Sequence, residues 1–319
     1  MGAQSVIPKI PAGTARTSRD FGMTSNAVKL AVLRLWGAAC CIPLLRGRLT
    51  IGEFLYGWLS PTETVVRTSI GSLAVEVDLT EPQGRFIFFR GYERAEVAFL
   101  RRQLKPGDVA VDVGAHVGFL TAIMANAVGP NGRVYAFEPD PRSFARLAHM
   151  AALETGRIEA RRTAVLDHAA DAIGAVRFYS DPAFPMYSTS RSELAGAHAR
   201  ELEVPATSLD AFFRQERVSR VDFVKIDVEG AEGAVIEGML ELFQDGYRPA
   251  ILCELRPGAW SSARVDTLRI LTDLGYQTYG IRRSGRLVSV DPAEIREHPG
   301  TLNIVFLTGS QACRKWRDV

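Results

Sequence analysis

The segment from Asp112 to Gly118 contains the residue types that bind a nucleotide. It reads Asp-Val-Gly-Ala-His-Val-Gly and lies between a strand-like apolar stretch and a helical one. In an open parallel sheet, ligands bind beyond the carboxyl ends of the strands, where such a loop lies. Gly114 lets the backbone approach a ligand, and Gly118 lets the next helix start close to the sheet. The segment therefore predicts a cofactor-binding loop that contains Asp112, Gly114, Ala115, His116 and Gly118.

A carboxylate stands where a ribose-binding acid is expected. Glu138 ends the apolar stretch 134–137 and precedes Pro139, about 20 residues past the loop. A carboxylate at this position can accept both ribose hydroxyls of an adenosine. Glycines after a strand often make only a tight turn, but the added acid favours a nucleoside site. We expect Glu138 and Pro139 to complete the cofactor site.

Two residues of the loop indicate a ligand without phosphates. His116 stands where a dinucleotide-binding loop has its second glycine, which lets a pyrophosphate approach the backbone. Asp112 would repel phosphates, but it could attract the ammonium group of a methionine moiety. The loop therefore favours S-adenosylmethionine, and an NAD(P)-dependent oxidoreductase is the alternative.

A second group of charged residues lies at the end of the strand-like stretch 221–226 and directly after it. Alternate residues of a strand share a face, so Lys225 and Asp227 are expected to point the same way. Glu254 ends the following apolar stretch, 251–253. If the two strands are neighbours, Asp227, Glu229 and Glu254 converge beside the cofactor.

These carboxylates suit two kinds of chemistry. Asp227 is the first candidate to orient or deprotonate an acceptor hydroxyl, with Glu254 second and Lys225 beside them; burial would have to raise the pKa of such a base. Alternatively, Asp227, Glu229 and Glu254 could hold Mg²⁺, which prefers oxygen ligands and would acidify the acceptor. The residues alone do not separate the two hypotheses.

A structural interpretation of the same residues is also available. Glu229 and Glu232 could begin a helix, where acids suit the helix dipole, and Lys225 could merely pair with a carboxylate. We favour the structural interpretation for Glu232, because acids are common in a first helical turn. We favour a functional one for Asp227, because an acid that ends an apolar strand is costly without a partner or a ligand.

The composition argues against several classes of protein. The net charge is +2, so no concentrated basic face for nucleic acid is expected. Enzymes that methylate base amines usually carry an Asn/Asp-Pro-Pro-aromatic motif, and the segment 227–230 reads Asp-Val-Glu-Gly instead. The four cysteines form no CxxC pair or disulfide framework, so we expect neither zinc nor disulfides and a cytoplasmic location.

No apolar run reaches the roughly 20 residues that a membrane-spanning helix needs. The segment 35–45 has the length of a signal-peptide core, but no clear cleavage site follows it. A packed helix or a weak membrane-surface contact within residues 28–59 is the better interpretation.

The pattern of elements predicts four parts. Residues 1–25 are expected to be disordered, 26–92 to form a helical and antiparallel β flank, 93–310 to form the catalytic domain, and 311–319 to be a basic tail. In the flank we expect helices broken at Pro43 and Gly47, a hairpin at Gly71-Ser72 and a third strand at 85–89.

In the catalytic domain, alternating strands and helices predict an α/β fold with a parallel sheet covered on both faces. Strands are expected at 109–113, 133–137, 158–165, 176–179, 221–226, 250–254, 276–281 and 302–307, and helices at 93–104, 119–128, 141–154, 209–216, 231–242 and 262–274.

The sequence resembles the FkbM family of S-adenosylmethionine-dependent methyltransferases from about Glu93 to Leu307. The resemblance rests on the segments 111–118, 137–139, 204–210 (Val-Pro-Ala-Thr-Ser-Leu-Asp) and 225–232 (Lys-Ile-Asp-Val-Glu-Gly-Ala-Glu). It implies the seven-stranded, Rossmann-like class I methyltransferase sheet with its last strand antiparallel. Family members often have asparagines in the helix after the ribose acid, whereas this chain has Leu-Ala-His-Met-Ala at 147–151.

The resemblance also implies methylation of a hydroxyl, often on a sugar, a glycolipid or a polyketide. We therefore expect a small-molecule, sugar or lipid-linked acceptor and no nucleic acid. The acceptor should be shaped by the N-terminal flank and the variable segment 166–208, which includes Phe184, Met186, Tyr187 and Ser188. A nucleic-acid methyltransferase and a degenerate cofactor-binding scaffold are further alternatives.

Overall fold

The computed structural model describes residues 25–40, 47–154, 156–181, 188–255, 267–309 and 311. The predicted disordered N-terminus and basic tail lie outside these residues except for Ser25 and Gln311, as do Phe184, Met186 and Tyr187 of the variable segment. Cys40 and Cys253 are buried.

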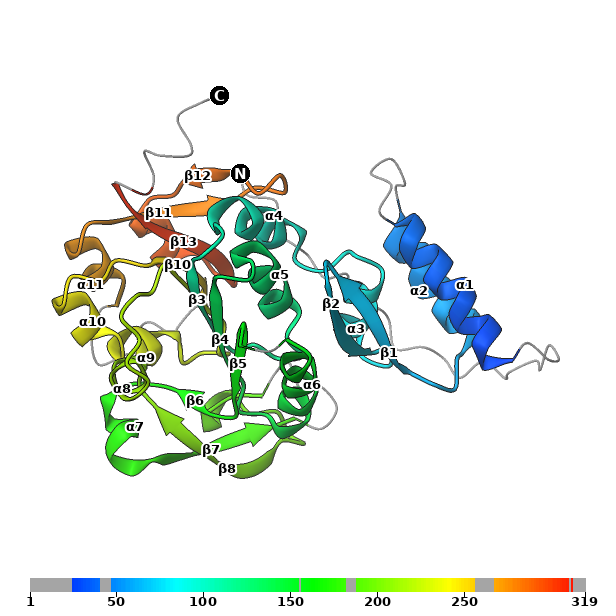
Figure 1. Cartoon of the computed structure of the whole chain (residues 1–319), viewed down its shortest axis with the longest axis horizontal. Coiled ribbons are helices and arrows are strands. Elements are labelled where there is room, and N and C mark those ends of the chain that lie inside the picture. Colours follow the sequence, from blue (N-terminus) through cyan, green and yellow to red (C-terminus); the bar gives the residue numbers. More distant parts are fainter. Residues whose placement is uncertain are drawn as a thin grey trace.

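A central mixed sheet organises the molecule. Its strands are β3 (Val109–Val113), β4 (Arg133–Phe137), β5 (Ile158–Arg161), β9 (Phe223–Ile226), β10 (Ala250–Leu255), β11 (Tyr276–Ile281), β12 (Leu287–Ser289) and β13 (Leu302–Thr308). They lie in the order β12-β11-β13-β10-β9-β3-β4-β5 (Figure 1). From β5 to β10 neighbouring strands are parallel, and β13 is antiparallel to both β10 and β11. The expected seven-stranded arrangement with a reversed last strand is confirmed, and β12 adds an edge strand that the sequence did not predict.

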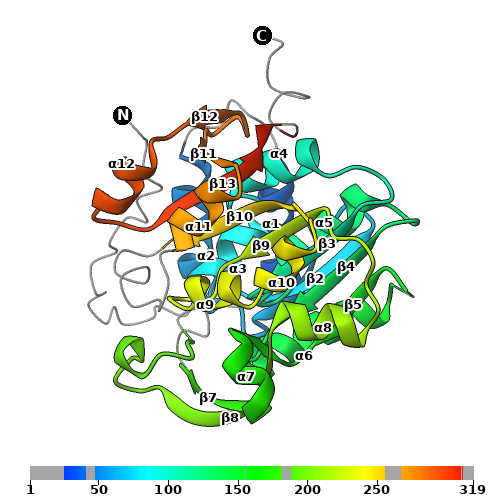
Figure 2. The ribbon, with the colours of Figure 1, turned by 90° about the vertical axis from the view of Figure 1, so that its left-hand side faces the viewer.

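Helices cover both faces of this sheet (Figures 1 and 2). One face carries α4 (Arg94–Gln103), α5 (Phe119–Val128) and α6 (Pro141–Ala152), and the other carries α8 (Leu209–Gln215), α9 (Glu232–Glu237), α10 (Leu240–Gln244) and α11 (Thr267–Asp273). A further helix, α12 (Pro292–Glu297), precedes β13. Every residue of β9 is buried, as expected for a strand between two helical layers.

Two predicted elements are interrupted. The helix expected at 231–242 is divided at Gly238 into α9 and α10; a Cβ atom at Gly238 would lie 2.1 Å from the backbone oxygen of Leu166. The strand expected at 158–165 ends at Arg161, and a short strand, β6 (Ala164–Val165), joins a second sheet instead.

The second sheet is built from the variable segment. It has the order β6-β8-β7, with β7 (Ala175–Ser180) antiparallel to β8 (Arg200–Thr207), and α7 (His168–Ile173) precedes β7. Only β7 was predicted. Arg142 Nη2 donates to the backbone oxygen of Asp181 (2.6 Å), and Thr189 Oγ1 donates to that of Glu229 (2.9 Å). These contacts hold the second sheet against the segments that follow β4 and β9.

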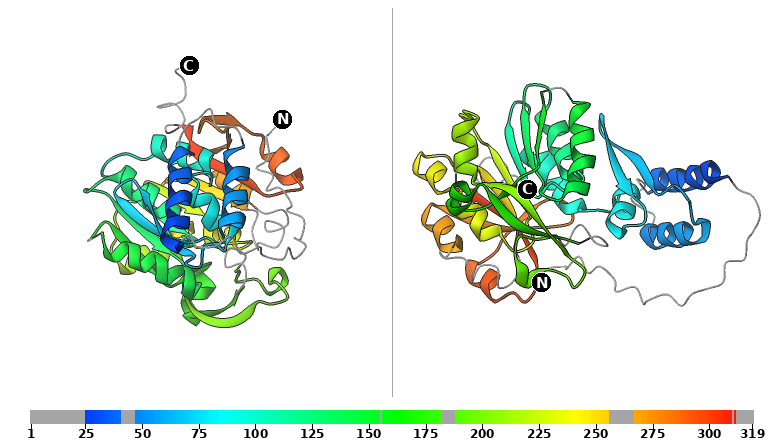
Figure 3. Two further views of the ribbon diagram at one scale, coloured as in Figure 1. Left: turned by 90° about the vertical axis from the view of Figure 1, so that its right-hand side faces the viewer. Right: turned by 90° about the horizontal axis from the view of Figure 1, so that it is seen from below.

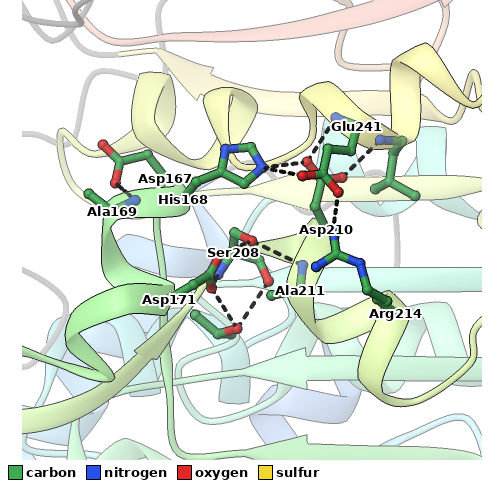
Figure 4. A network of polar contacts seen from close by, with 11 residues as sticks. Asp167, His168, Ala169, Asp171, Ser208, Asp210, Ala211, Arg214 and Glu241 are labelled. Carbon is green, nitrogen blue, oxygen red and sulfur yellow. Dashed lines mark hydrogen bonds and ion pairs between the residues drawn. The ribbon is translucent and has the colours of Figure 1, made fainter.

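The segment 204–210, which contributes to the family resemblance, has a structural role in a polar network (Figure 4). Ser208 Oγ accepts from Ala211 N (3.0 Å) and so caps α8, while Asp171 accepts from both Ser208 N and Ser208 Oγ (2.6 and 2.7 Å). Asp210 accepts from the first amides of α10, at Glu241 and Leu242 (2.9 Å each). The network therefore joins α7, α8 and α10.

The N-terminal flank contains α1 (Asn26–Ala39), α2 (Arg48–Leu59), β1 (Val65–Ile70), β2 (Leu73–Asp78) and α3 (Pro82–Phe88). The two helices and the hairpin, in which Ile70 pairs with Leu73, are confirmed. The predicted third strand at 85–89 is wrong, because these residues belong to α3 and its C-terminus. A short apolar run does not distinguish a strand from a buried helix. Here Phe88 packs on Gly37 of α1 and Phe89 on Gly52 of α2.

Gly84 in α3 provides a test of this packing. A Cβ atom at Gly84 would lie 2.0 Å from the backbone oxygen of Asp78, so we expect Gly84→Ala to lower the free energy of unfolding by roughly 2 kcal/mol or more. Gly57→Ala in α2 is the matched control, since no atom lies within 4 Å of its added Cβ and alanine should stabilise that helix by about 1 kcal/mol. Urea denaturation followed by circular dichroism measures both, and equal midpoints would contradict the described packing.

Candidate active site

The loop after β3 has the close packing that its glycines allow. Gly114 and Gly118 have φ angles of 79° and 87°. A Cβ atom at Gly114 would lie 1.8 Å from the backbone oxygen of Asp227, and one at Gly118 would lie 2.6 Å from Cε of Met150 in α6. The amides of Gly114 and Ala115 both donate to the backbone oxygen of Phe137 (3.0 and 2.9 Å). The loop is thus fixed between the ends of β4 and β9.

Glu138 lies directly against this loop, at the carboxyl end of β4. Its Oε2 accepts from the amide of His116 (2.7 Å), and its Oε1 accepts from the amide of Asp140 (2.8 Å). Burial raises the pKa of Glu138 to about 8, although both amide donors act in the opposite direction. Pro139 follows it and is partly buried. The structure therefore brings the predicted ribose acid and the predicted loop together.

His116 adds unusual features to the loop. Its φ angle is 51°, in the left-handed region that residues with side chains rarely adopt. Among the described residues, no hydrogen-bond partner is found for either of its buried ring nitrogens. Burial lowers the pKa of His116 to about 4, so its imidazole is neutral near pH 7.

Asp112, in β3, has partners inside the protein. Its side chain is completely buried, its Oδ2 accepts from Thr121 Oγ1 of α5 (2.6 Å), and its Oδ1 lies 3.4 Å from Nζ of Lys225. The carboxylate is therefore committed to partners within the protein. Its predicted contact with a methionine ammonium stays a prediction.

Lys225 occupies the centre of the site. Its Nζ donates to the backbone oxygen of Gly114 (2.9 Å) and lies 3.2 Å from Oδ2 of Asp227, in addition to the contact with Asp112. Burial by itself would lower the pKa of Lys225, but the nearby carboxylates of Asp227, Asp112 and Glu93 outweigh it and raise that pKa. Lys225 is thus a permanent ammonium group and the electrostatic partner of the surrounding acids. Because Lys225 and Asp227 contact each other, the expected shared face is confirmed.

Asp227 and Glu254 lie side by side at the ends of two neighbouring strands. Strands β9 and β10 are parallel, and Ile226 pairs with Cys253, one residue before each acid. The two carboxyl groups share a hydrogen bond, and the charge of Asp227, together with burial, raises the pKa of Glu254. One proton between the two groups therefore resides on Glu254, while Asp227 is ionised beside the Lys225 ammonium. The Asp227 side chain remains 22 % exposed, so it is accessible to a ligand.

The other acids of this segment have different roles. Oε1 of Glu232, the first residue of α9, accepts from the amide of Gly230 (2.8 Å), which agrees with its structural interpretation. Glu229 has a φ angle of 52°, and its charge raises the pKa of Glu254. Within the described ranges, no group of three or more His, Cys, Asp or Glu residues is arranged to hold a metal ion. The Mg²⁺ site at Asp227, Glu229 and Glu254 remains an untested prediction.

Glu93 is a site residue that the sequence did not reveal. It precedes α4 with a φ angle of 41°, and burial raises its pKa to about 8, against the attraction of the Lys225 ammonium. Its neighbour Tyr92 packs edge-on against Phe119, the first residue of α5 (5.6 Å between ring centroids), and its hydroxyl accepts from Gln83 of α3 (2.6 Å). Glu93 looked only like the start of a helix, because Lys225 and Asp227, whose charges act on its pKa, lie more than 100 residues away in the sequence.

The buried Lys225–Asp112 pair can be tested by a double-mutant cycle. Lys225→Met leaves the Asp112 carboxylate buried without its ammonium partner, and we expect a loss of about 3–5 kcal/mol in the free energy of unfolding. Asp112→Asn removes that charge, so the double variant should regain part of the loss. Urea denaturation measures the cycle. Strictly additive effects of the two substitutions would show that the pair is not coupled.

A family profile and two known proteins that resemble this chain all indicate a methyltransferase family. The profile described as the methyltransferase FkbM domain matches residues 112–278. The chain is 29 % identical over 164 residues to the 31-O-demethyl-FK506 methyltransferase FkbM of Streptomyces tacrolimicus, covering 43 % of this chain and 61 % of that one. It is 26 % identical over 152 residues to the hexuronic acid methyltransferase AglP of Haloferax volcanii, covering 48 % and 58 %. The chain thus spans about three fifths of the length of these relatives.

Solved structures with a similar arrangement include the methyltransferase FkbM of Methylobacillus flagellatus, at 13 % identity and a TM-score of 0.39, covering 70 % of this chain and 54 % of that one. They also include the fibrillarin of Aeropyrum pernix with bound S-adenosyl-L-methionine, at 16 % identity and a TM-score of 0.34, covering 66 % and 73 %. Because the family profile matches more than half of its residues, the chain belongs to the FkbM methyltransferase family.

Proposed function

We propose that this protein transfers the methyl group of S-adenosylmethionine to a hydroxyl group of its acceptor. The observation that carries the proposal is the Asp227–Glu254 pair, which lies at the carboxyl ends of adjacent strands and beside the loop 112–118. Ligands of open α/β sheets bind at this edge. A carboxylate base next to a cofactor site is what methylation of a hydroxyl requires.

The loop fits the cofactor. Gly114 offers backbone without a Cβ, Glu138 offers a carboxylate beside the loop, and His116 has two buried ring nitrogens for which the described residues provide no partner. Glu138 would hold the ribose, and the loop would hold the rest of the nucleoside. The bound cofactor would supply an activated methyl group. Asp112 and Asp227 share a single ammonium group, Lys225, and the negative charge that remains would repel a diphosphate, which favours this cofactor over NAD(P).

Asp112 supports the site through Lys225 in this proposal. Because the Asp112 carboxylate is fully buried and lies near the Lys225 ammonium, it fixes that ammonium, which in turn holds Asp227 and the backbone of Gly114. Asp227, with its partly exposed carboxylate, is the acid that can meet a ligand.

Asp227 is the proton acceptor of the proposed reaction. Its carboxylate would orient the acceptor hydroxyl and take its proton as the oxygen is methylated, so that the protein supplies orientation and proton removal. Protonated Glu254 donates a hydrogen bond to Asp227 and keeps it in place. The charges of Asp227 and Glu229, together with burial, raise the pKa of Glu254, which keeps the shared proton on Glu254 and leaves Asp227 able to accept another.

The acceptor is proposed to be a small molecule, a sugar or a lipid-linked sugar. One relative is named for a hexuronic acid and another for an O-demethyl compound, which favours hydroxyl-bearing acceptors over nucleic acid. The second sheet contacts the backbone of Glu229 through Thr189 and is positioned to contribute to acceptor recognition. Because the cofactor is made inside cells, we propose that the reaction takes place in the cytoplasm.

The ribose assignment predicts the effect of Glu138→Ala. Loss of the two hydrogen bonds between Glu138 and the ribose hydroxyls should weaken the binding of S-adenosylhomocysteine about tenfold to a hundredfold. Isothermal titration calorimetry measures it, with Glu159→Ala, a partly exposed acid of β5, as the control. Thermal unfolding checks that the loop variant is folded. If folded Glu138→Ala binds as tightly as the wild type, Glu138 does not hold the ribose.

The proton-transfer roles predict different results at the two acids. Asp227→Asn removes the base, so methyl incorporation into an acceptor found among hexuronates and polyols should fall roughly 10²- to 10⁴-fold. Glu254→Gln retains a hydrogen-bond donor and should lower turnover by no more than about tenfold.

Turnover of the wild type should decline at alkaline pH as Glu254 loses its proton, and Glu254→Gln should lack this decline. A fully active Asp227→Asn would refute the proposed base, and loss of turnover in EDTA would favour the Mg²⁺ alternative.

A further inference from the structure

The two N-terminal helices expose apolar side chains on their outer faces. Val28, Val32 and Leu35 are spaced i, i+4 and i+7 on α1, and Ile51, Phe54 and Trp58 are spaced i, i+3 and i+7 on α2, so each set lies on one helix face. The exposed fraction is 73 % for Leu35 and 70 % for both Phe54 and Trp58. These are large values for such side chains.

The inner faces of the same helices are buried within the N-terminal flank. Leu30, Leu33 and Gly37 of α1 are buried, and Gly52 of α2 packs on Phe89. A surface helix normally shows polar residues opposite its buried stripe. Here the outer face of α1 consists of apolar residues and a single charge, Arg34. We refer to these exposed side chains as the apolar patch, which consists of Val28, Val32, Leu35, Ile51, Phe54 and Trp58. Exposed apolar side chains that gather in this way mark an interaction surface.

The patch lies at one end of the molecule. Figures 1 and 3 show α1 and α2 side by side, beyond the hairpin β1–β2 and away from the central sheet. Among the residues that the structure describes, none beyond this end of the molecule would obstruct its contact with a large flat surface.

The charges around the patch are basic. The described side chains of the two helices include Lys29 and Arg34 against one acid, Glu53, which is held by Nε of Arg85 at 2.8 and 2.9 Å. One exposed acid, Glu63, follows α2 next to Thr62, whose amide donates to Oδ1 of Asn26 in α1 (2.8 Å). Exposed Arg90 adjoins Gly91, which packs on Leu49 of α2. Within the described residues, no ion pair is found for Arg34 or Arg90. Apolar and aromatic side chains with a basic surround match the interface of an anionic lipid bilayer.

We propose that α1 and α2 dock this protein on the surface of an anionic lipid bilayer, with Leu35, Phe54 and Trp58 entering the boundary between headgroups and acyl chains. Among the described helices, none is long and apolar enough to cross a membrane, so the pair lies on the surface. A second copy of the chain suits the patch less well, because a twofold interface would bring the two basic surrounds together. The inference concerns binding alone and is independent of methyl transfer.

Flotation of the full-length protein with vesicles tests the proposal. We expect binding to vesicles of phosphatidylcholine with phosphatidylglycerol, weaker binding to phosphatidylcholine alone, and release by salt. The variant Leu35→Glu/Phe54→Glu/Trp58→Glu should lower the bound fraction at least about tenfold. Ile173→Glu in α7 is the matched control, since it replaces an apolar residue of the same 70 % exposure elsewhere, and it should bind like the wild type. The double variant Arg34→Gln/Arg90→Gln should bind less to the vesicles that contain phosphatidylglycerol, and its binding to pure phosphatidylcholine vesicles should be unchanged.

Three results would overturn the proposal. The first is that the wild type binds neither kind of vesicle, and the second is that the triple variant, shown to be folded by circular dichroism, binds as well as the wild type. Alternatively, sedimentation equilibrium without lipid would show self-association that the triple variant abolishes, which would assign the patch to a second copy.

Discussion

The buried ammonium group of Lys225 is the interaction on which the site depends. It joins the end of β3 through Asp112, the cofactor loop through the backbone of Gly114, and the end of β9 through Asp227. Several carboxyl groups gather here, and like charges at such distances would repel one another strongly without a cation. The ammonium allows Asp227 to remain ionised, and the ionised Asp227 in turn keeps the proton on Glu254.

Three of the six non-glycine residues with positive φ angles in the described part of the chain lie around this cation. Glu93, His116 and Glu229 all have positive φ angles between 41° and 52°, although none is glycine. Such conformations persist only where the surrounding structure imposes them. Each of the three belongs to a different segment that ends at the site, namely the turn before α4, the cofactor loop and the segment after β9. The surrounding packing therefore imposes three unfavourable backbone conformations, and these direct the side chains and backbone groups of the three segments toward the site.

The sequence predicted the central sheet well because its strands are short, apolar and followed by glycines or acids. It also placed Lys225, Asp227 and Glu254 together, since the carboxyl ends of adjacent parallel strands must meet. It failed where distant packing decides the outcome. The run 85–89 became helical because Phe88 and Phe89 pack on α1 and α2, and Glu93 joined the acids through contacts with residues far along the chain. The internal partners of Asp112 were hidden for the same reason.

The contact between Gly114 and Asp227 has a consequence for how the two ligands influence each other. The backbones at these residues are in direct contact, and Lys225 bonds to both segments, so the loop cannot shift without displacing the proposed base. If the proposed sites are right, occupancy of one half of the site would change the affinity of the other, and by thermodynamic linkage the effect would be reciprocal. Cofactor and acceptor should bind cooperatively, with the first ligand ordering the pocket that the second one enters.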